Sequence, residues 1–333
     1  MVALSDIQAS NARLPTHLTA VFVGATSGIG LYTLQSFARN CKNPTAYFIG
    51  RSQTSGSRIV SELKTVNPAG TFTFLQSDIS LIKNVDAVCT QIKDKEKCIN
   101  MLVMSQGIMT IGTENEEGIL PLASLVLHSR IRFIVNLLPL LQAAPQLRRV
   151  LSIFTGTKEG PMPSPDLQMR NSGLSIMKMR AQGASSVTLS LEGVAKGAED
   201  VGFVHAFPGP VRSNIARDSG IFLFLLRGLF KVIGPWVFIP ETESGDRHLF
   251  LATSGMYPGR KREADGVEVG KEEVKMGTNG EVGSGVYSVD EKCESADEKV
   301  TQVLKRLREE GKDEIVWNTI QEDCLRITGR EKI

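Results

Sequence analysis

The sequence predicts an α/β protein built on a doubly wound parallel sheet, with a C-terminal helical appendage. From about Leu18 to Ser254, short apolar runs alternate with longer amphipathic stretches, which is the pattern of repeated strand-helix units. The runs are almost wholly apolar, as expected of parallel strands covered on both faces. The predicted strands are Thr19–Gly24, Thr45–Gly50, Thr71–Gln76, Met101–Met104, Val150–Phe154 and Gly202–Ala206.

The first predicted strand runs into a glycine-rich turn, with Gly24, Gly28 and Gly30 before and within the start of the next helix. A strand followed by such a turn brings backbone N–H groups and the positive end of a helix dipole toward a pyrophosphate. We therefore expect this unit to bind a dinucleotide, although a glycine trio alone could also be a tight turn.

The end of the second predicted strand carries Arg51, and no Asp or Glu occurs between Leu18 and Ser61. An acid at this place would bind the ribose 2′-hydroxyl of NAD, whereas an arginine can pair with the 2′-phosphate of NADP. The sequence thus favours NADP(H), unless Arg51 is simply an exposed loop residue.

The residues after Ser254 have a different composition. Residues 258–285 are rich in Gly, Lys and Glu and predict a solvent-exposed excursion. Ser295 and Glu298 have the spacing of a capping box that opens a helix to about Glu310. A last helix, about Glu314 to Arg326, should turn its apolar residues Val316, Trp317 and Ile320 inward. We expect residues 1–254 to form the NADP-binding domain and residues 255–333 to pack on it.

The composition excludes several classes of protein. The 333 residues include 41% hydrophobic and 22% charged residues, as in folded globular proteins. The net charge of +2 comes without a basic block, so nucleic acid is not an expected partner. The five cysteines form no C-x-x-C pair, which argues against a zinc site or a disulfide framework. A polar N-terminus without a signal sequence fits a cytoplasmic location.

One strongly apolar stretch, Ile221 to Ile239, could suggest membrane contact. It is interrupted by Arg227, Lys231 and Pro235, and charges near the middle of a span are costly. We expect a cover over an apolar substrate and no stable membrane insertion.

The spacing Gly-x-x-x-Gly-x-Gly resembles the fingerprint of the short-chain dehydrogenase/reductase superfamily, whose fold is of the Rossmann type. Later landmarks occur in the same order as in that family: Asp78-Ile79-Ser80 at the adenine contact, Met104-Ser105-Gln106-Gly107 at the Asn-Asn-Ala-Gly turn, and Pro208-Gly209 at the nicotinamide. The resemblance spans about Leu18 to Ser254. It implies that the cofactor contacts Gly24, Ser27, Gly28, Ile29, Gly30, Arg51, Asp78, Ile79, Ser105, Gln106, Gly107, Pro208, Gly209, Val211 and Ser213.

The catalytic positions depart from the family pattern, which is a Ser followed by Tyr-x-x-x-Lys on the next helix. Thr155 takes the place of the Ser and can make the same hydrogen bond. When the helix predicted over Ser172 to Lys196 is aligned on Glu192, Met179 and Gly183 occupy the Tyr and Lys positions. The helix contains no tyrosine, since the tyrosines are Tyr32, Tyr47, Tyr257 and Tyr287. The family's Asn falls near Val126.

Several residues could replace the missing pair. We take Thr155 and Lys178 as the candidate catalytic residues; Arg180, Lys158, Glu159 and His128 are further candidates. Lys178 and each of these further candidates also have a structural interpretation, as a solvated helix face, a loop ion pair or a packed histidine.

The sequence keeps the cofactor motifs but departs from the family at the catalytic positions. This combination resembles that of a divergent branch of the family found in filamentous fungi, some of whose members modify secondary metabolites. This resemblance implies an NADPH-dependent reductase acting on a small apolar carbonyl or alcohol. A non-redox isomerase or cyclase, or a regulatory protein that binds NADP, stays open. The sequence also leaves a homo-oligomer open.

Overall fold

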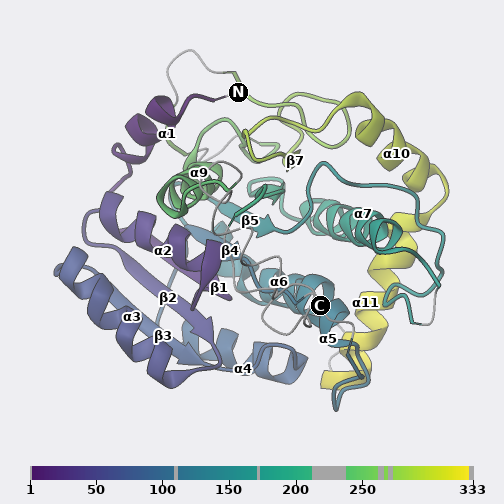
Figure 1. Ribbon diagram of the computed structural model, residues 1–333, viewed down its shortest axis with the longest axis horizontal. Coiled ribbons are helices and arrows are strands. Elements are labelled where there is room, and N and C mark those ends of the chain that lie inside the picture. The colour runs from purple at the N-terminus through teal and green to yellow at the C-terminus, as the bar shows by residue number, and fades with distance from the viewer. Residues whose placement is uncertain are drawn as a thin grey trace.

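A computed structural model describes residues 2–108, 112–170, 173–211, 238–261, 266–268 and 273–329. Its centre is a seven-stranded, wholly parallel sheet with the strand order β3-β2-β1-β4-β5-β6-β7 (Figure 1). The strands are β1 (Thr19–Val23), β2 (Thr45–Gly50), β3 (Thr71–Gln76), β4 (Met101–Met104), β5 (Arg149–Ile153), β6 (Gly202–Ala206) and β7 (Val286–Val289). The predicted fold class is confirmed.

The central strands are buried on both faces, as their continuous apolar runs predict. Every residue of β1, β4, β5 and β6 is buried. In the order of the sheet, the chain moves outward from β1 to β3 and then crosses back to β4. This crossing brings the loops after β1 and β4 together at the carboxyl edge, where open parallel sheets bind their ligands.

The seventh strand was not predicted. β7 lies beyond the Gly-rich excursion and pairs with β6, with Phe203 opposite Val286 and Ala206 opposite Val289. Its four residues are all buried, and the ring of Tyr287 packs edge-on against Tyr257 with centroids 5.5 Å apart. A four-residue run between glycines and charged residues carries too little periodicity to be separated from a loop.

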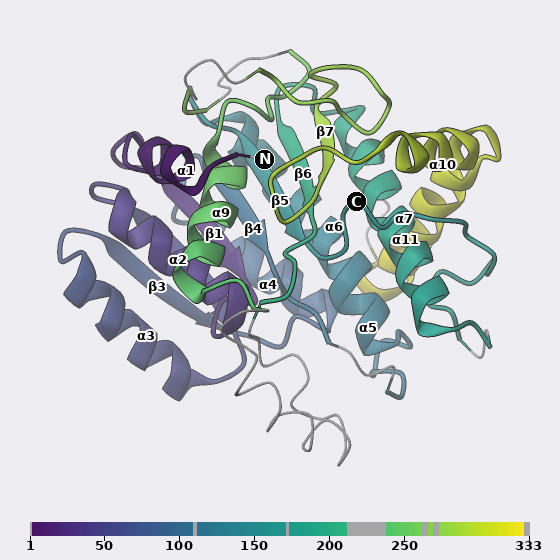
Figure 2. The ribbon, with the colours of Figure 1, turned by 45° about the horizontal axis from the view of Figure 1, so that its top comes forward.

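Helices cover both faces of the sheet, as Figures 1 and 2 show. Each face has its own apolar core. One face carries α1 (Leu4–Asn11), α2 (Gly28–Asn40), α3 (Gln53–Val66) and α9 (Glu241–Thr253). The other carries α4 (Ile82–Lys93), α5 (Pro121–Ala123), the π-helical turn η1 (Ser124–His128), α6 (Ser129–Gln142), α7 (Ile176–Ala195), α10 (Glu298–Glu309) and α11 (Lys312–Thr328).

The C-terminal helices lie against the second face. Val316 and Ile320 of α11 are fully buried, and the Trp317 ring is half-buried against α7, where Gly193 provides the space. The predicted capping box is wrong. The cap of α10 is Asp297, whose carboxylate accepts the Val300 N–H at 3.0 Å, while the Ser295 hydroxyl donates to the Met276 carbonyl. The Ser295 hydroxyl, which the local pattern assigns to capping the helix, thus makes a hydrogen bond to a residue distant in the sequence.

Within the described residues, one helical segment is long and apolar enough to cross a membrane, Pro121–Gln142. Its most apolar 18-residue part is 67% buried inside the fold, and the Arg130 and Arg132 side chains of the segment are buried as well. These features identify a core helix. The apolar stretch Ile221–Ile239, for which we expected a cover, lies outside the described residues apart from its last two.

Candidate active site

The predicted cofactor residues gather at the carboxyl edge of the sheet, where the turn after β1 packs against the turn after β4. Gly24 has a φ of +77°, and a Cβ on it would lie 2.7 Å from the Gln106 backbone nitrogen. A Cβ on Gly30 would lie 2.2 Å from the Ser105 hydroxyl oxygen. The Ser105 hydroxyl also donates to the Val23 carbonyl at 3.2 Å. These two glycines are therefore required by the packing of the turns.

The first turn of α2 is open to a ligand. Ser27 occupies the N-cap position, is exposed, and makes no capping hydrogen bond with its side chain. Gly28 has a φ of +59°, and Ile29 is half-buried against the core on this face. Because the Ser27 side chain does not cap the first N–H groups of the helix, these groups can bind an anion together with the positive end of the helix dipole.

The residues after β2 and β3 lie next to this turn. The Thr26 side chain packs on Gly50, which precedes Arg51. The Arg51 side chain is exposed and makes no hydrogen bond or ion pair within the described residues; only its carbonyl is used, accepting from the Gln76 amide at 3.0 Å. One oxygen of Asp78 accepts the Ser80 hydroxyl at 2.8 Å.

Two further cofactor positions occur in these turns. Ile79 is buried behind Asp78, whereas Gly107 is half-buried directly after Gln106. Ile79 follows the carboxyl end of β3 and Gly107 that of β4, and both ends lie at the same edge of the parallel sheet.

The loop after β6 closes the other side of the edge. Pro208 and Gly209 are half-buried, and the Gly209 backbone lies against the Glu291 and Ile239 side chains. Val211 forms an isolated parallel bridge with Ile239. The last predicted cofactor residue, Ser213, lies outside the described residues.

Thr155 lies just past the end of β5, at the same edge. The preceding residue, Phe154, continues the pairing with β6 because its N–H donates to the Ala206 carbonyl at 2.9 Å. The Thr155 N–H donates to His205 Nε2 at 3.2 Å. The Thr155 hydroxyl oxygen is buried and has no hydrogen-bond partner within the described residues. An unmet buried hydroxyl is destabilising, so this group is suited to bind an oxygen of a ligand.

A buried polar network fixes Thr155 from behind. Glu159 and His205 have fully buried side chains. Glu159 Oε1 accepts the hydroxyls of Thr188 and Ser288, both at 2.7 Å, and the Thr188 oxygen lies 2.8 Å from His205 Nδ1. Because His205 Nε2 accepts a backbone N–H, the proton is on Nδ1. The chain of contacts therefore runs from Glu159 through Thr188 and His205 to the Thr155 backbone.

The carboxyl of Glu159 is held in its charged form. Burial alone would raise its pKa, but the contacts with His205, Thr188 and Ser288 outweigh burial and keep the pKa below its usual range. Glu159 is among the residues predicted from the sequence, whereas its three partners are not. These come from α7, β6 and β7, and no local pattern connects them.

The loop between Thr155 and Glu159 is strained. Thr157 has a φ of +61°, which is rare for a β-branched residue. Its N–H donates to the Ser288 hydroxyl at 2.7 Å, and its own hydroxyl oxygen is buried without a partner in the described part of the chain. Such strained backbone occurs preferentially at functional sites and persists only where the surroundings hold it.

Helix α7 carries Lys178 and the two positions aligned with the family's Tyr and Lys, Met179 and Gly183. A Cβ on Gly183 would lie 3.5 Å from the Phe154 ring, next to Thr155, and Met179 is half-buried one turn earlier. Lys178 is exposed in the first turn and makes no side-chain contact with Thr155 among the described residues. The helix begins at Ile176, later than the predicted Ser172, because Ser175 caps it by accepting the Lys178 N–H.

The turn that replaces the family's Asn is apolar, but a buried arginine follows it. Val126 is buried within η1. Arg130 is fully buried and donates to the Met104, Gln106 and Ile153 carbonyls at 3.1, 2.6 and 3.0 Å. Burial lowers the pKa of Arg130 to about 9, so the guanidinium stays charged at neutral pH and joins the ends of β4 and β5.

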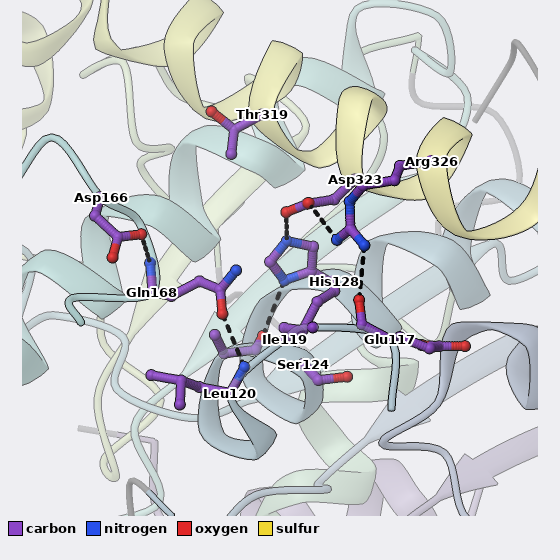
Figure 3. Close-up of polar contacts among 12 residues, drawn as sticks. Glu117, Ile119, Leu120, Ser124, His128, Asp166, Gln168, Thr319, Asp323 and Arg326 are labelled. Atoms are coloured by element: carbon purple, nitrogen blue, oxygen red, sulfur yellow. Dashed lines mark hydrogen bonds and ion pairs between the residues drawn. The ribbon is translucent and has the colours of Figure 1, made fainter. Parts of the chain in front are cut away.

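His128 faces α11, as Figure 3 shows. Its Nε2 lies 2.9 Å from Asp323 Oδ2, and its Nδ1 lies 3.2 Å from the Ala123 carbonyl. Both neighbours are acceptors, so the ring satisfies both only when it carries two protons. The other oxygen of Asp323 accepts from Arg326, which also donates to the Glu117 carbonyl. His128 thus holds η1 to α11 and makes no side-chain contact with Thr155 in the part of the chain that the structure describes.

Comparison with known proteins agrees with this arrangement. A family model for short chain dehydrogenases matches residues 18–147. The oxidoreductase AN1596 of Emericella nidulans is 38% identical over 326 residues, covering 96% of each protein. The short-chain dehydrogenase/reductase SAT2 of Stachybotrys chartarum is 28% identical over 323 residues, covering 89% of each.

A solved structure shares the fold at low identity. The short-chain dehydrogenase from Sphingobium yanoikuyae, in complex with NADPH, superimposes with a TM-score of 0.52 at 18% identity, over 76% of this chain and 86% of that one. The strand order, the glycine turn and the full-length similarity to fungal oxidoreductases lead to one conclusion. The chain belongs to the short-chain dehydrogenase/reductase family of oxidoreductases.

Proposed function

We propose that this protein is an NADPH-dependent reductase that acts on the carbonyl group of an apolar small molecule, such as an intermediate of secondary metabolism. The observation that carries the proposal is the Thr155 hydroxyl, which is buried without a hydrogen-bond partner in the described part of the chain, at the edge where the first turn of α2 lies. The similarity to fungal oxidoreductases supports the metabolic setting.

The residues at the carboxyl edge fit NADP(H). The N–H groups of the first turn of α2 suit the pyrophosphate, and the exposed guanidinium of Arg51 suits the 2′-phosphate. The family motifs imply that Asp78 would contact the adenine and that Pro208 and Gly209 would contact the nicotinamide. When bound, the cofactor supplies the hydride.

The protein's own groups then orient the carbonyl. The Thr155 hydroxyl donates to the carbonyl oxygen, while Glu159 and His205 hold the Thr155 backbone in place. Lys178, a water molecule or the substrate itself supplies the proton, because α7 lacks the family's tyrosine. General acids typically contribute about 10²- to 10⁴-fold, so the reaction is slow without one but still takes place.

The setting that we propose is the cytoplasm, with a small apolar carbonyl or alcohol as the partner. A net charge of +2 without a basic block supports the absence of nucleic-acid binding. The burial of Pro121–Gln142 within the fold supports the absence of stable membrane insertion. The proposal leaves a homo-oligomer open.

The test is calorimetric titration of the full-length protein with NADPH and NADH. A charged hydrogen bond contributes about 1.5–3 kcal/mol, so NADPH should bind roughly 10- to 100-fold more tightly. Arg51→Asp should abolish or reverse this preference, and Arg58→Asp, which alters an exposed arginine of α3, should not. Equal affinities for both nucleotides in the unmodified protein would contradict the cofactor assignment. Product formation without NADPH consumption would favour the isomerase or cyclase alternative.

A further inference from the structure

Two positively charged side chains meet at one aromatic ring beside the candidate active site. Phe207 follows β6 directly and precedes Pro208. Lys158 Nζ lies 4.9 Å from the centroid of the Phe207 ring, and the guanidinium carbon of Arg180 lies 5.2 Å from it. The two cations come from separate elements, the loop after β5 and helix α7. Their convergence is therefore a product of the tertiary fold.

One of the two cationic residues belongs to the loop that contains Thr155. The Lys158 N–H donates to the Thr155 carbonyl at 3.2 Å, so Lys158 belongs to the same tight loop. Phe207 is adjacent to this loop because the pairing of β5 with β6 continues through Phe154 and Ala206. The partnerless hydroxyls of Thr155 and Thr157 are in this loop as well. The region thus combines two hydroxyl groups with two cations.

No carboxylate neutralises these cations within the described residues. Lys158 and Arg180 are both half-buried, and Arg180 Nε is buried with no hydrogen-bond partner. Half-buried arginines elsewhere in the described chain do hold carboxylates: Arg148 lies 2.6 Å from Asp200, and Arg308 lies 3.0 Å from Glu192. The Phe207 ring stabilises the two cations less than a carboxylate would, because a cation–π contact is weaker than a buried ion pair with hydrogen bonds.

The nearest acid in the sequence does not serve as their partner. Glu159 directs Oε1 to the Thr188 and Ser288 hydroxyls and lies 3.5 Å from His205. Oε1 is thereby bound within the network behind Thr155, and Oε2 is buried without a hydrogen-bond partner among the described residues, so neither oxygen is paired with Lys158 or Arg180 there. The positive charge of Lys158 and Arg180 is left to attract an anion from outside the described chain.

We propose that Lys158 and Arg180 form an anion-recognition site beside Thr155, so that the substrate carries an acidic oxygen next to its reacting carbonyl. The acidic oxygen belongs to a carboxylate, as in a 2-oxo acid, or to the enolate of a 1,3-dicarbonyl compound. Arginine and hydroxyl donors match such oxygens in geometry and charge. The inference rests on the proposed function and narrows its substrate class from apolar carbonyls to acidic ones.

The test measures binding rather than turnover, using full-length protein loaded with NADP+, which has no hydride to donate. Two probe pairs are titrated by calorimetry. Benzoylformate against its methyl ester tests the carboxylate. Dimedone, which is largely ionised near neutral pH, against its neutral O-methyl ether tests the enolate. At least one charged probe should bind roughly 10- to 100-fold more tightly than its neutral analogue, the range expected for charged hydrogen bonds.

Variants connect the preference to the two cations. Arg180→Gln and Lys158→Gln should each remove most of the preference for the charged probe, and Arg180→Lys should retain part of it because the charge is kept. Arg306→Gln, which changes an arginine on the exposed side of α10 that is 80% exposed, should have no effect. The Lys158 variant lies in a loop, so it can still be assayed if substitution within α7 prevents folding.

The outcomes separate this inference from the proposed function. If NADP+ binds but charged and neutral probes bind equally in both pairs, the anion site is refuted while the cofactor assignment stands. If NADP+ does not bind in a separate titration, the proposed function fails. The probes are then titrated against the protein alone, and the variants still decide whether Lys158 and Arg180 bind an anion.

Discussion

The contact between His128 and Asp323 predicts a pH-dependent contribution to stability. Burial alone would raise the pKa of Asp323, but hydrogen bonds and charge interactions with His128 and Arg326 outweigh it and lower the pKa from 3.8 to about 2. The Asp323 side chain is only 18% exposed, so solvent screens these interactions incompletely. Because the folded pKa is below the unfolded one, the ionised carboxylate stabilises the fold above about pH 4 and loses this effect toward pH 2.

The magnitude follows from the shift. At 1.36 kcal/mol per pKa unit, Asp323 contributes about 2.5 kcal/mol near neutral pH. Asp323→Asn should therefore lower the free energy of unfolding by about 2–3 kcal/mol. For a chain of this size, that loss lowers the melting temperature by roughly 3–5 °C. The difference between the two proteins should shrink as the pH falls below about 4.

Denaturant unfolding at a series of pH values measures this contribution. Glu322→Gln is the matched control, because Glu322 is an exposed neighbour on α11 without an ion pair among the described residues. A loss from Asp323→Asn that is the same at neutral pH and at the acid end of the series would refute the ion-pair explanation. So would an equal loss from Glu322→Gln.

The candidate active site gives two further predictions. Thr155→Val keeps the shape of the side chain but removes the hydroxyl, so the rate of NADPH consumption with a reducible carbonyl should fall at least tenfold. Thr155→Ser keeps a hydroxyl and should retain most of the rate. Equal rates for both variants would contradict the assignment of Thr155. The double variant Met179→Tyr with Gly183→Lys should raise NADPH consumption with diketones and aldehydes about tenfold or more, because it restores a general acid on the helix face next to Phe154. A folded, NADPH-binding variant without any gain would mean that the alignment of α7 is wrong.

Much of the sheet could be predicted from the sequence because parallel strands buried on both faces leave a strong local signal. The apolar runs of β1, β2 and β4 match their strands closely. The glycine turn was equally local, since strand, turn and helix are adjacent in the chain. By contrast, β7 has only four residues, and its pairing with β6 depends on a contact across more than eighty residues of sequence.

The polar groups behind Thr155 could not be predicted for a related reason. Glu159, Thr188, His205 and Ser288 come from four segments, and each has an ordinary structural explanation when taken alone. Only the fold brings them together. Local patterns can also mislead: Ser295 has the spacing of a helix cap, yet its hydroxyl bonds to the Met276 carbonyl.

The unfavourable conformation and buried polar groups of residues 155–159 indicate that this loop has kept a function and is not only a structural connection left over from the family fold. Two buried hydroxyls there have no hydrogen-bond partner among the described residues, at a cost of about 1–3 kcal/mol each, and the left-handed backbone of Thr157 adds about 1–3 kcal/mol. Together these free-energy costs are comparable with the whole free energy of unfolding of a typical domain, about 5–15 kcal/mol. A turn that served only to connect β5 to α7 could avoid them with glycine at position 157 and apolar side chains. The chain instead surrounds this loop with the Glu159 network and the Arg130 contacts, which hold the Thr155 hydroxyl where a bound carbonyl oxygen would satisfy it.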